Sequence, residues 1–286
     1  MTPASGLAIF RILGVPALAA GLAGTASGQA PPVPHARVSL VAESLAVTRG
    51  QILHVALRQE IQPGWHSYWV NPGDSGLATA IDWKLPPGFA ADPIGWPIPE
   101  RFRAGTLVNY GYEGDVLLPI TITVPTTLDP GSAVTLAGHA SWLACSEICV
   151  PGEADVTLTL PVATGPAARD PQWADRLQSV RAALPAEAQD PATLTVGRDS
   201  VELHLALAGA DRLRDIVFFP VADGIIDNDA DQRVETAPNG MTITLVRGVL
   251  KASPLDRLAG ILVFRDKGIE GGARRRAIAI SVPTAP

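Results

Sequence analysis

Short segments with alternating apolar and polar residues recur about every ten residues through both halves of the chain. In one of them, Leu53, Val55 and Leu57 share one face, and His54 and Arg58 lie on the other. A two-residue period places successive side chains on opposite faces of a strand. One face of such a strand is buried while the other stays mixed, as in an antiparallel sheet. The pattern therefore predicts a mainly β protein of the sandwich or barrel class.

The expected strands fall into two groups separated by a different pattern. The first group is Ala36–Val41, Gln51–Gln59, Ala78–Trp83, Val116–Val124, Ser132–Trp142 and Ala154–Leu160. The second group is Ala192–Arg198, Val201–Leu207, Ile216–Phe219, Met241–Arg247, Gly260–Arg265 and Ala277–Val282. Each group has enough strands for a sandwich of its own.

One helix is expected between the two groups. Asp170 is suited to cap it, Pro171 fits the first helical position, and Pro185 ends it. Its apolar stripe consists of Trp173, Leu177, Val180 and Leu184. The small, Gly- and Pro-bearing residues before it read as a linker, which predicts one domain over residues 31–163 and a second β-rich domain over residues 170–286.

Residues 1–30 have the features of an export signal. Arg11 is the only early charge, the apolar run Ile12–Ala23 follows it, and small residues follow that run. The run is shorter than the roughly 20 apolar residues that a membrane span needs. We therefore expect cleavage between Ala23 and Ala30 and a soluble mature chain in a periplasm-like compartment, where disulfides are permitted.

Composition excludes several classes of protein. The net charge is −6 with a pI near 5.4, whereas nucleic-acid binders usually carry a basic surplus. The chain has two cysteines, which excludes a disulfide-dense scaffold and any four-cysteine zinc or iron–sulfur site.

The two cysteines are the residues most suited to chemistry. One expected strand leads to Cys145 and another begins after Cys149, which places the pair at a hairpin tip or a sheet edge. A bridge across three residues requires a turn that brings the Cα atoms within about 7 Å. Closing so short a loop stabilises a chain by only about 2 kcal/mol in the chain-entropy model. A chain that can bury a large core needs little such support, so we interpret the pair as redox-active, with a plain structural bridge as the alternative.

The residues around the pair do not predict strong activation of the thiols. Glu147 lies between the cysteines, and a carboxylate opposes formation of a thiolate. His139 is six residues before Cys145, about 20 Å along an extended strand, so we expect an ordinary sheet histidine there. The pair is then a modest nucleophile that exchanges with a better-activated partner.

Three separated motifs resemble the periplasmic N-terminal region of DsbD/ScsB-type protein-disulfide reductases. They are the run from Gly64-Trp65-His66 to Asp74-Ser75-Gly76, the run Tyr110-Gly111-Tyr112-Glu113-Gly114 with Leu118-Pro119-Ile120 after it, and the cysteine segment ending Cys149-Val150-Pro151. They occur in the order of that family and span residues 36–162. Residues 170–286 resemble the second sandwich of the ScsB-like branch.

This resemblance implies immunoglobulin-like sandwiches and a thiol–disulfide interchange function without a cofactor. In that family the pair receives electrons from a membrane-embedded domain through a thioredoxin-like domain. It passes them to periplasmic disulfide isomerases, thioredoxin-like proteins or cytochrome c maturation factors. By resemblance Cys149 is the exchanging sulfur and Cys145 the resolving one. The chain ends at Pro286 without a membrane domain, so we expect a separate membrane-embedded electron donor.

The family also implies a loop that shields the cysteine pair. The matching residues here are Pro99–Arg103, with Phe102 as the expected shield and Glu100 beside it. Ordinary core packing is the alternative for Phe102. The aromatic residues Trp65, Tyr68, Trp69 and Tyr110 are candidates for contact with a partner, with core packing again as the alternative.

Two other functions compete with thiol–disulfide exchange. Soft thiolates suit Cu(I), so Cys145 and Cys149 could hold copper with help from His66 or His139, although no methionine-rich tract supports this. The third reading is a structural adaptor with an inert disulfide. The chain also contains a loop with Asp227, Asn228, Asp229 and Asp231. It lacks the glycine and glutamate of a calcium-binding loop, which predicts a solvated loop.

Overall fold

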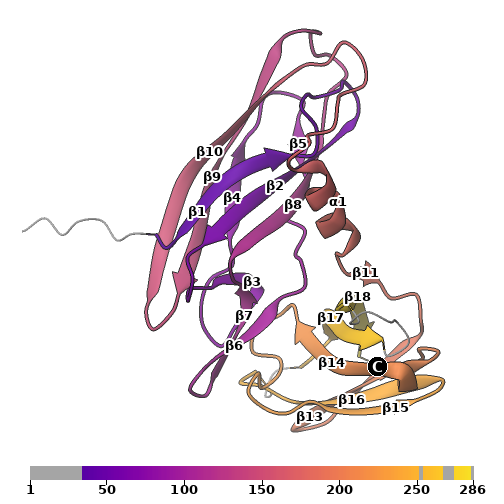
Figure 1. The fold of residues 1–286 in the computed structure, drawn as a ribbon. Helices are drawn as coiled ribbons and strands as arrows, with labels where there is room; N and C mark the ends of the chain where they lie inside the picture. The colour runs from indigo at the N-terminus through magenta and orange to yellow at the C-terminus, as the bar shows by residue number, and fades with distance from the viewer. Residues whose placement is uncertain (1–33, 251–253, 267–273, 285–286) are drawn as a thin grey trace, which may run out of the picture. The chain divides into compact units, whose positions relative to one another are not determined.

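Antiparallel sheets make up most of the structure, as the alternating pattern predicts (Figure 1). The computed structural model describes residues 34–250, 254–266 and 274–284. Residues 33–286 form one compact unit by their contacts. The expected export signal lies outside the described residues.

Residues 36–161 form three sheets. The first has the order β1 (Ala36–Ala42), β2 (Ile52–Ile61), β8 (Asp115–Thr123) and β5 (Ala90–Ala91). The second has the order β10 (Cys149–Pro161), β9 (Ala133–Cys145) and β4 (Ala80–Lys84). The third is short and has the order β3 (Ser67–Gly73), β7 (Leu107–Tyr112) and β6 (Glu100–Ala104).

The hairpin of β9 and β10 is the longest paired element among the described residues. Thirteen residues pair continuously, from Ala133 with Pro161 to Cys145 with Cys149. Alternate residues of β9, among them Val134, Leu136 and Ala140, are buried in the core shared with the β1–β2–β8 sheet. Their alternation fixes which face of the hairpin is buried, because a slip of one residue would expose every one of them. The hairpin therefore delivers the two cysteines to its tip as the sequence predicts.

Helix α1 (Ala174–Ala182) covers part of the β1–β2–β8 sheet. Leu177 is fully buried and packs with Val41, Ala56 and Leu117, while Trp173 is partly buried beside them. Asp170 accepts hydrogen bonds from the backbone N–H groups of Gln172 and Trp173 and caps the turn that precedes the helix. The helix is shorter than the sequence predicted, because the predicted helix extended from the cap at Asp170 to Pro185.

Residues 186–283 form two further sheets. One has the order β11 (Ala186–Glu187), β18 (Arg276–Pro283), β17 (Arg257–Asp266) and β14 (Leu213–Pro220). The other has the order β12 (Ala192–Val196), β13 (Ser200–Leu205), β16 (Gly240–Val246) and β15 (Arg233–Ala237). A short 3-10 turn covers Ala210–Arg212. A core of its own joins these two sheets, so the prediction of a mainly β fold with two immunoglobulin-like sandwiches and one helix is confirmed.

Side chains from the two groups of sheets pack in a common core, although no described strand of one group pairs with a described strand of the other. Phe219 of β14 and Ile261 and Val263 of β17 belong to the core of the first group. The phenyl ring of Phe219 lies edge-on to Trp69 and Tyr110, with centroids 6.2 and 5.0 Å apart. The division into domains over residues 31–163 and 170–286 stays a prediction, and the shared core means that the two groups are packed together.

Strands β3, β6 and β7 were not predicted, although they carry most of the residues around the cysteines. Strand β3 contains Pro72 and Gly73, and β7 contains Asn109 and Gly111, residues that weaken a strand pattern. The pairing of β3 with β7 is also irregular, with a register shift between Tyr68 and Gly73. Tertiary packing overrides local preference in this sheet.

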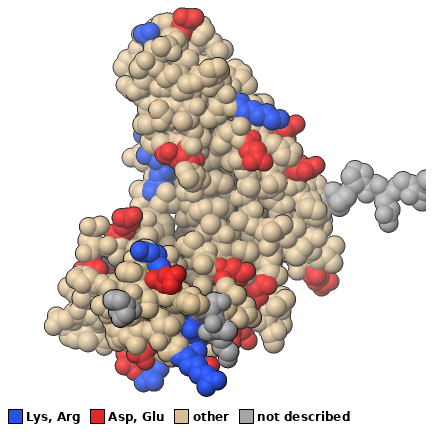
Figure 2. Space-filling view, turned by 180° about the vertical axis from the view of Figure 1, so that it is seen from behind, with Lys and Arg blue, Asp and Glu red and all other residues tan. Residues whose placement is uncertain are grey.

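Charged residues are sparse and mixed in sign on the face that Figure 2 shows. Large uncharged areas lie between them, in keeping with a chain of which 17% is charged. Among the described residues, no helix is long and apolar enough to cross a membrane.

Candidate functional site at the tip of the long hairpin

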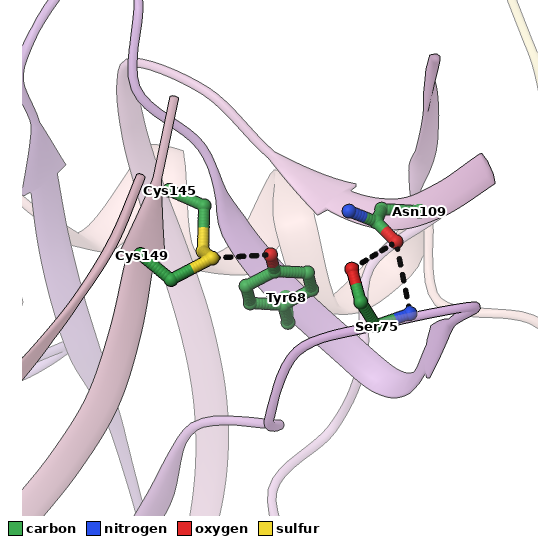
Figure 3. Close-up of a disulfide and its surroundings, with 5 residues drawn as sticks. All are labelled: Tyr68, Ser75, Asn109, Cys145 and Cys149. Atoms are coloured by element: carbon green, nitrogen blue, oxygen red, sulfur yellow. Dashed lines mark hydrogen bonds between the residues drawn. A yellow bond between two sulfur atoms is a disulfide. The ribbon is translucent and has the colours of Figure 1, made fainter. Parts of the chain in front are cut away.

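Cys145 and Cys149 form a disulfide at the tip of the β9–β10 hairpin (Figure 3). They are the last paired residues of the ladder, and their Cα atoms are 4.1 Å apart. The turn between them is closed by the N–H of Ser146, which donates to the carbonyl of Ile148. Pairing in the ladder thus brings the two Cα atoms within the distance that a disulfide across three residues requires.

The two sulfurs differ in access to solvent. Cys145 is 2% exposed, whereas Cys149 is exposed. Ile148, which precedes Cys149, is 65% exposed. An incoming sulfur can therefore reach Cys149 more readily than Cys145.

The backbone of Cys145 is tied to a second element. Its N–H donates to the carbonyl of His66 and its carbonyl accepts from the N–H of His66, both at 2.9 Å. These paired bonds continue the ladder across to the segment that enters β3. The buried cysteine is thereby held from both sides, whereas Cys149 is paired on one side.

Tyr68 contacts the exposed cysteine. Its hydroxyl donates toward Sγ of Cys149 at 3.7 Å, because a sulfur in a disulfide has no proton to give (Figure 3). Tyr68 is fully buried, and burial raises the pKa of its hydroxyl, with the neighbouring Ser75 opposing that rise. The phenol therefore stays protonated and remains a donor at neutral pH.

The turn after β3 holds the Tyr68 ring. Ser75 donates from both its N–H and its hydroxyl to Oδ1 of Asn109, each at 3.1 Å (Figure 3). Gly76 follows with a φ of +112°, and a Cβ there would lie 2.2 Å from the Tyr68 ring. Only glycine fits so close to the ring in that backbone conformation. The motif Gly73-Asp74-Ser75-Gly76 is thus a support for Tyr68.

The predicted shield residue lies beside this group. The Phe102 ring stacks on the His66 imidazole, with centroids 4.5 Å apart and planes 8° apart. The His66 imidazole also lies edge-on to the Tyr68 ring, with centroids 5.2 Å apart, so Phe102 is one ring away from the residue that contacts Cys149. The role of Phe102 as a shield stays a prediction. Burial lowers the pKa of the His66 imidazole. Glu100 is exposed at the start of β6.

The candidate partner-binding aromatics do not form a surface. Tyr68, Trp69 and Tyr110 are at most 1% exposed, and the rings of Trp69 and Tyr110 pack against each other and against Phe219. Their burial favours core packing, the alternative for these three residues, and their contact with a partner stays a prediction. Trp65 is partly exposed and stacks on His35 with centroids 3.5 Å apart, so its contact with a partner stays a prediction.

His66 and His139, the candidate copper ligands, lie in different surroundings. His139 pairs with Asp155 across the ladder, Nδ1 to Oδ1 at 3.0 Å, and lies well along β9 from the tip. The nearby Asp155 raises the pKa of this imidazole. Of the described residues, no three or more His, Cys, Asp or Glu side chains are grouped so as to hold a metal ion.

Sequence reasoning singled out the two cysteines. It named Tyr68 as a partner contact and Phe102 as a shield, and it did not identify the residues that support them. Asn109 was not singled out, and the only role assigned to His66 was that of a possible copper ligand, because no local signal in the sequence marks the place of either residue. Their roles arise because β3, β6 and β7 converge next to the hairpin tip.

Comparisons with known proteins agree with this geometry. Residues 37–161 match the family model described as "Thiol:disulfide interchange protein DsbD, N-terminal". A comparison with curated proteins gives no match.

One solved structure is similar over most of its length. The N-terminal periplasmic domain of ScsB from Proteus mirabilis has 19% identity and a TM-score of 0.61, over 90% of this chain and 97% of that one. A protein of unknown function from Porphyromonas gingivalis W83 has 10% identity and a TM-score of 0.23, over 86% of this chain and 96% of that one. The ScsB domain supports the fold over both groups of sheets, and residues 37–161, which carry the disulfide, match the model of the DsbD N-terminal thiol:disulfide interchange family.

Proposed function

We propose that this protein passes electrons through the Cys145/Cys149 pair in the periplasm and reduces disulfides of thioredoxin-like or cytochrome c maturation partners. The observation that carries the proposal is the unequal exposure of the two sulfurs in a bridge at the hairpin tip. The family match supports the chemistry, and the likeness to a periplasmic ScsB domain supports the compartment.

The exchange runs in two balanced steps. In the reduced protein the Cys149 thiolate attacks one sulfur of a partner disulfide, and the other partner sulfur leaves as a thiolate. The Cys145 thiol then loses its proton and attacks Sγ of Cys149, which restores the Cys145–Cys149 bond and releases the second partner sulfur. Two electrons and two protons pass to the partner, and a membrane-embedded reductase returns them through a thioredoxin-like carrier.

Three residues around the bridge are suited to assist these two steps. The Tyr68 hydroxyl lies where it can donate to the sulfur of Cys149 when that sulfur carries negative charge. The paired bonds to His66 keep Cys145 in place for the second attack. Ile148 is an apolar, exposed contact next to the attacking sulfur, suited to the apolar surface around a partner disulfide.

Trapping of a mixed disulfide tests the proposal. With Cys145→Ala, the first step can occur but the second cannot, so the partner stays bound to Cys149. We expect adducts with thioredoxin-like proteins from a periplasmic extract, seen as bands that a reductant removes and identified by mass spectrometry. The absence of any such adduct contradicts the proposal.

Cys149→Ala is the matched control. It keeps one thiol, but that thiol is the buried one, so we expect far fewer adducts than with Cys145→Ala. Equal trapping by both variants would overturn the assignment of Cys149 as the exchanging sulfur. A reduction potential of the wild-type pair below about −300 mV would indicate an inert structural bridge instead.

A further inference from the structure

We propose that Asn228, in the second group of sheets, is a positioning residue for the redox site and holds Tyr68 against Cys149. This inference rests on the proposed function, because it gives the residues 186–283 a part in the exchange reaction. It concerns the loop that the sequence reads as solvated. Asp227 and Asp231 of that loop are exposed, but Asn228 is only 5% exposed.

Asn228 binds all three elements of the β3–β7–β6 sheet. Its Nδ2 donates to Oδ1 of Asp74, just after β3, at 2.7 Å. Its Oδ1 accepts from the hydroxyl of Tyr110 in β7 at 2.8 Å. Its backbone carbonyl accepts from Nη2 of Arg101 in β6 at 2.5 Å. These three hydrogen bonds fix the positions of Asp74, Tyr110 and Arg101 relative to one another. Loss of any one of the bonds would leave a buried polar group without a partner, which costs free energy.

The contact with Asp74 leads directly to Tyr68. The other carboxylate oxygen of Asp74 accepts from the N–H of Val108 at 2.6 Å, so this residue pins the turn to β7. Ser75 and Gly76 come next in the chain. Ser75 is hydrogen-bonded to Asn109, and Gly76 lies so close to the Tyr68 ring that it leaves no room for a Cβ. Asn228 is thus linked to the sulfur of Cys149 through Asp74, the turn and Tyr68. Figure 3 shows the part of this link that runs from Ser75 and Tyr68 to Cys149.

Further contacts reinforce the same attachment. Arg103 of β6 pairs with Asp229, and Asn71 of β3 donates to the carbonyl of Pro220 at 2.8 Å. Arg275 donates to the carbonyl of Pro99, next to the strand that carries Phe102, at 2.8 Å. These bonds fasten the same sheet at other points. Asn228 is distinguished from them because its side chain is buried and reaches the turn under Tyr68.

The test measures the reactivity of Cys149 with a small reagent, so it does not depend on any protein partner. The full chain has two cysteines, and Cys145→Ala leaves Cys149 as its single thiol. Iodoacetamide alkylation of that variant across a range of pH gives the pKa of the Cys149 thiol. Adding Asn228→Ala should displace Tyr68 and slow alkylation at pH 7 roughly three- to tenfold, because the thiolate loses a hydrogen-bond donor.

A mutant cycle with Tyr68→Phe separates positioning from general loosening of the fold. If Asn228 acts through the Tyr68 hydroxyl, Asn228→Ala should have no further effect once that hydroxyl is gone. The matched control, Asp231→Ala, changes an exposed residue of the same loop and should leave alkylation unchanged. Asn228→Gln, which keeps the amide but displaces it, serves the same cycle if Asn228→Ala does not fold.

Two outcomes overturn the inference. One is an unchanged pH profile of alkylation in Asn228→Ala and Asn228→Gln, and the other is a fall of the same size in the Tyr68→Phe background. Failure of the proposed function looks different. In that case the alkylation cycle holds while Cys145→Ala traps no partner.

Discussion

At the scale of single residues, the main feature of the site is that its two cysteines differ in burial. Cys145 and Cys149 are four residues apart in one hairpin, yet only Cys149 is exposed. Tyr68 is buried, which keeps its hydroxyl protonated, and it points at the exposed sulfur. No cationic residue lies next to the cysteines in the sequence, and the hydrogen-bond donor to Cys149 is the neutral hydroxyl of Tyr68. Cys149 is therefore expected to be a modest nucleophile.

Removal of the Tyr68 hydroxyl should make the Cys149 thiol harder to ionise. A phenol that donates to a thiolate stabilises the charged form, so Tyr68→Phe in the Cys145→Ala chain should raise the pKa of the thiol. Hydrogen bonds to charged groups contribute about 1.5–3 kcal/mol, which corresponds to a loss of roughly tenfold or more in alkylation rate at neutral pH.

Tyr112→Phe is the control for that prediction. Its hydroxyl donates to the carbonyl of Pro97 rather than to the bridge, and the residue is also buried, at 5% exposed. The pH dependence of iodoacetamide alkylation should shift for Tyr68→Phe and stay in place for Tyr112→Phe. Equal profiles for the two variants would mean that the 3.7 Å contact has no effect on the sulfur.

At the scale of elements, local pattern predicted those strands whose two faces differ clearly. The β9–β10 hairpin was predicted together with the cysteines at its tip, because its alternation is regular. Strands β6 and β7 were missed, because polar residues and glycines interrupt their pattern. Helix α1 was predicted from its stripe, of which Leu177 packs on the sheet as expected.

Helix α1 is also fastened by charge, which predicts a dependence of stability on pH. Asp115 accepts from Arg58 in β2 and from Arg176 in the helix. The hydrogen bond from Arg58, followed by that from Arg176, lowers the pKa of Asp115 from 3.8 to about 2. The carboxylate therefore stabilises the fold fully above about pH 4, and this contribution is lost as the pH falls toward 2.

Asp115→Asn measures that contribution. Its side chain is 36% exposed, so solvent screening limits the contribution to about 1 kcal/mol or less. Urea unfolding should show wild type more stable than Asp115→Asn at pH 6, with the difference disappearing near pH 2. Asp175→Asn, at a 94% exposed position on the same helix, should show little difference at either pH. A gap that persists at pH 2 would contradict the assignment.

At the scale of the whole molecule, a shared core couples the two groups of sheets. Phe219 comes from β14 but packs with Trp69 and Tyr110 behind the site, and it is 1% exposed. The site is therefore supported from residues far away in the sequence, both by this ring and by Asn228. A family match limited to residues 37–161 does not include either residue.

Phe219→Ala should destabilise residues 36–161 although it lies outside them. Truncation of a buried phenylalanine typically costs about 3–5 kcal/mol. All six tryptophans lie between residues 65 and 173, so tryptophan fluorescence during urea unfolding reports on the first group of sheets. We expect a lower fluorescence midpoint for the variant.

Val221→Ala is the control for the Phe219 prediction, since Val221 is 43% exposed and follows the same strand. It should leave the fluorescence midpoint nearly unchanged. The idea of a shared core fails if Phe219→Ala lowers only the far-UV circular dichroism transition and leaves tryptophan fluorescence at its wild-type midpoint.

The sequence by itself determined the strand class, the single helix and the placement of Cys145 and Cys149 together at a hairpin tip. These features follow from short-range periodicity and from residues four apart, which the chain order fixes. Only the tertiary structure decided that Cys149 is the exposed sulfur, that Tyr68 faces it and that Asn228 supports the turn beneath. Asn228 and Asp74 are 154 residues apart, and no local pattern records a contact made by packing two sheets together.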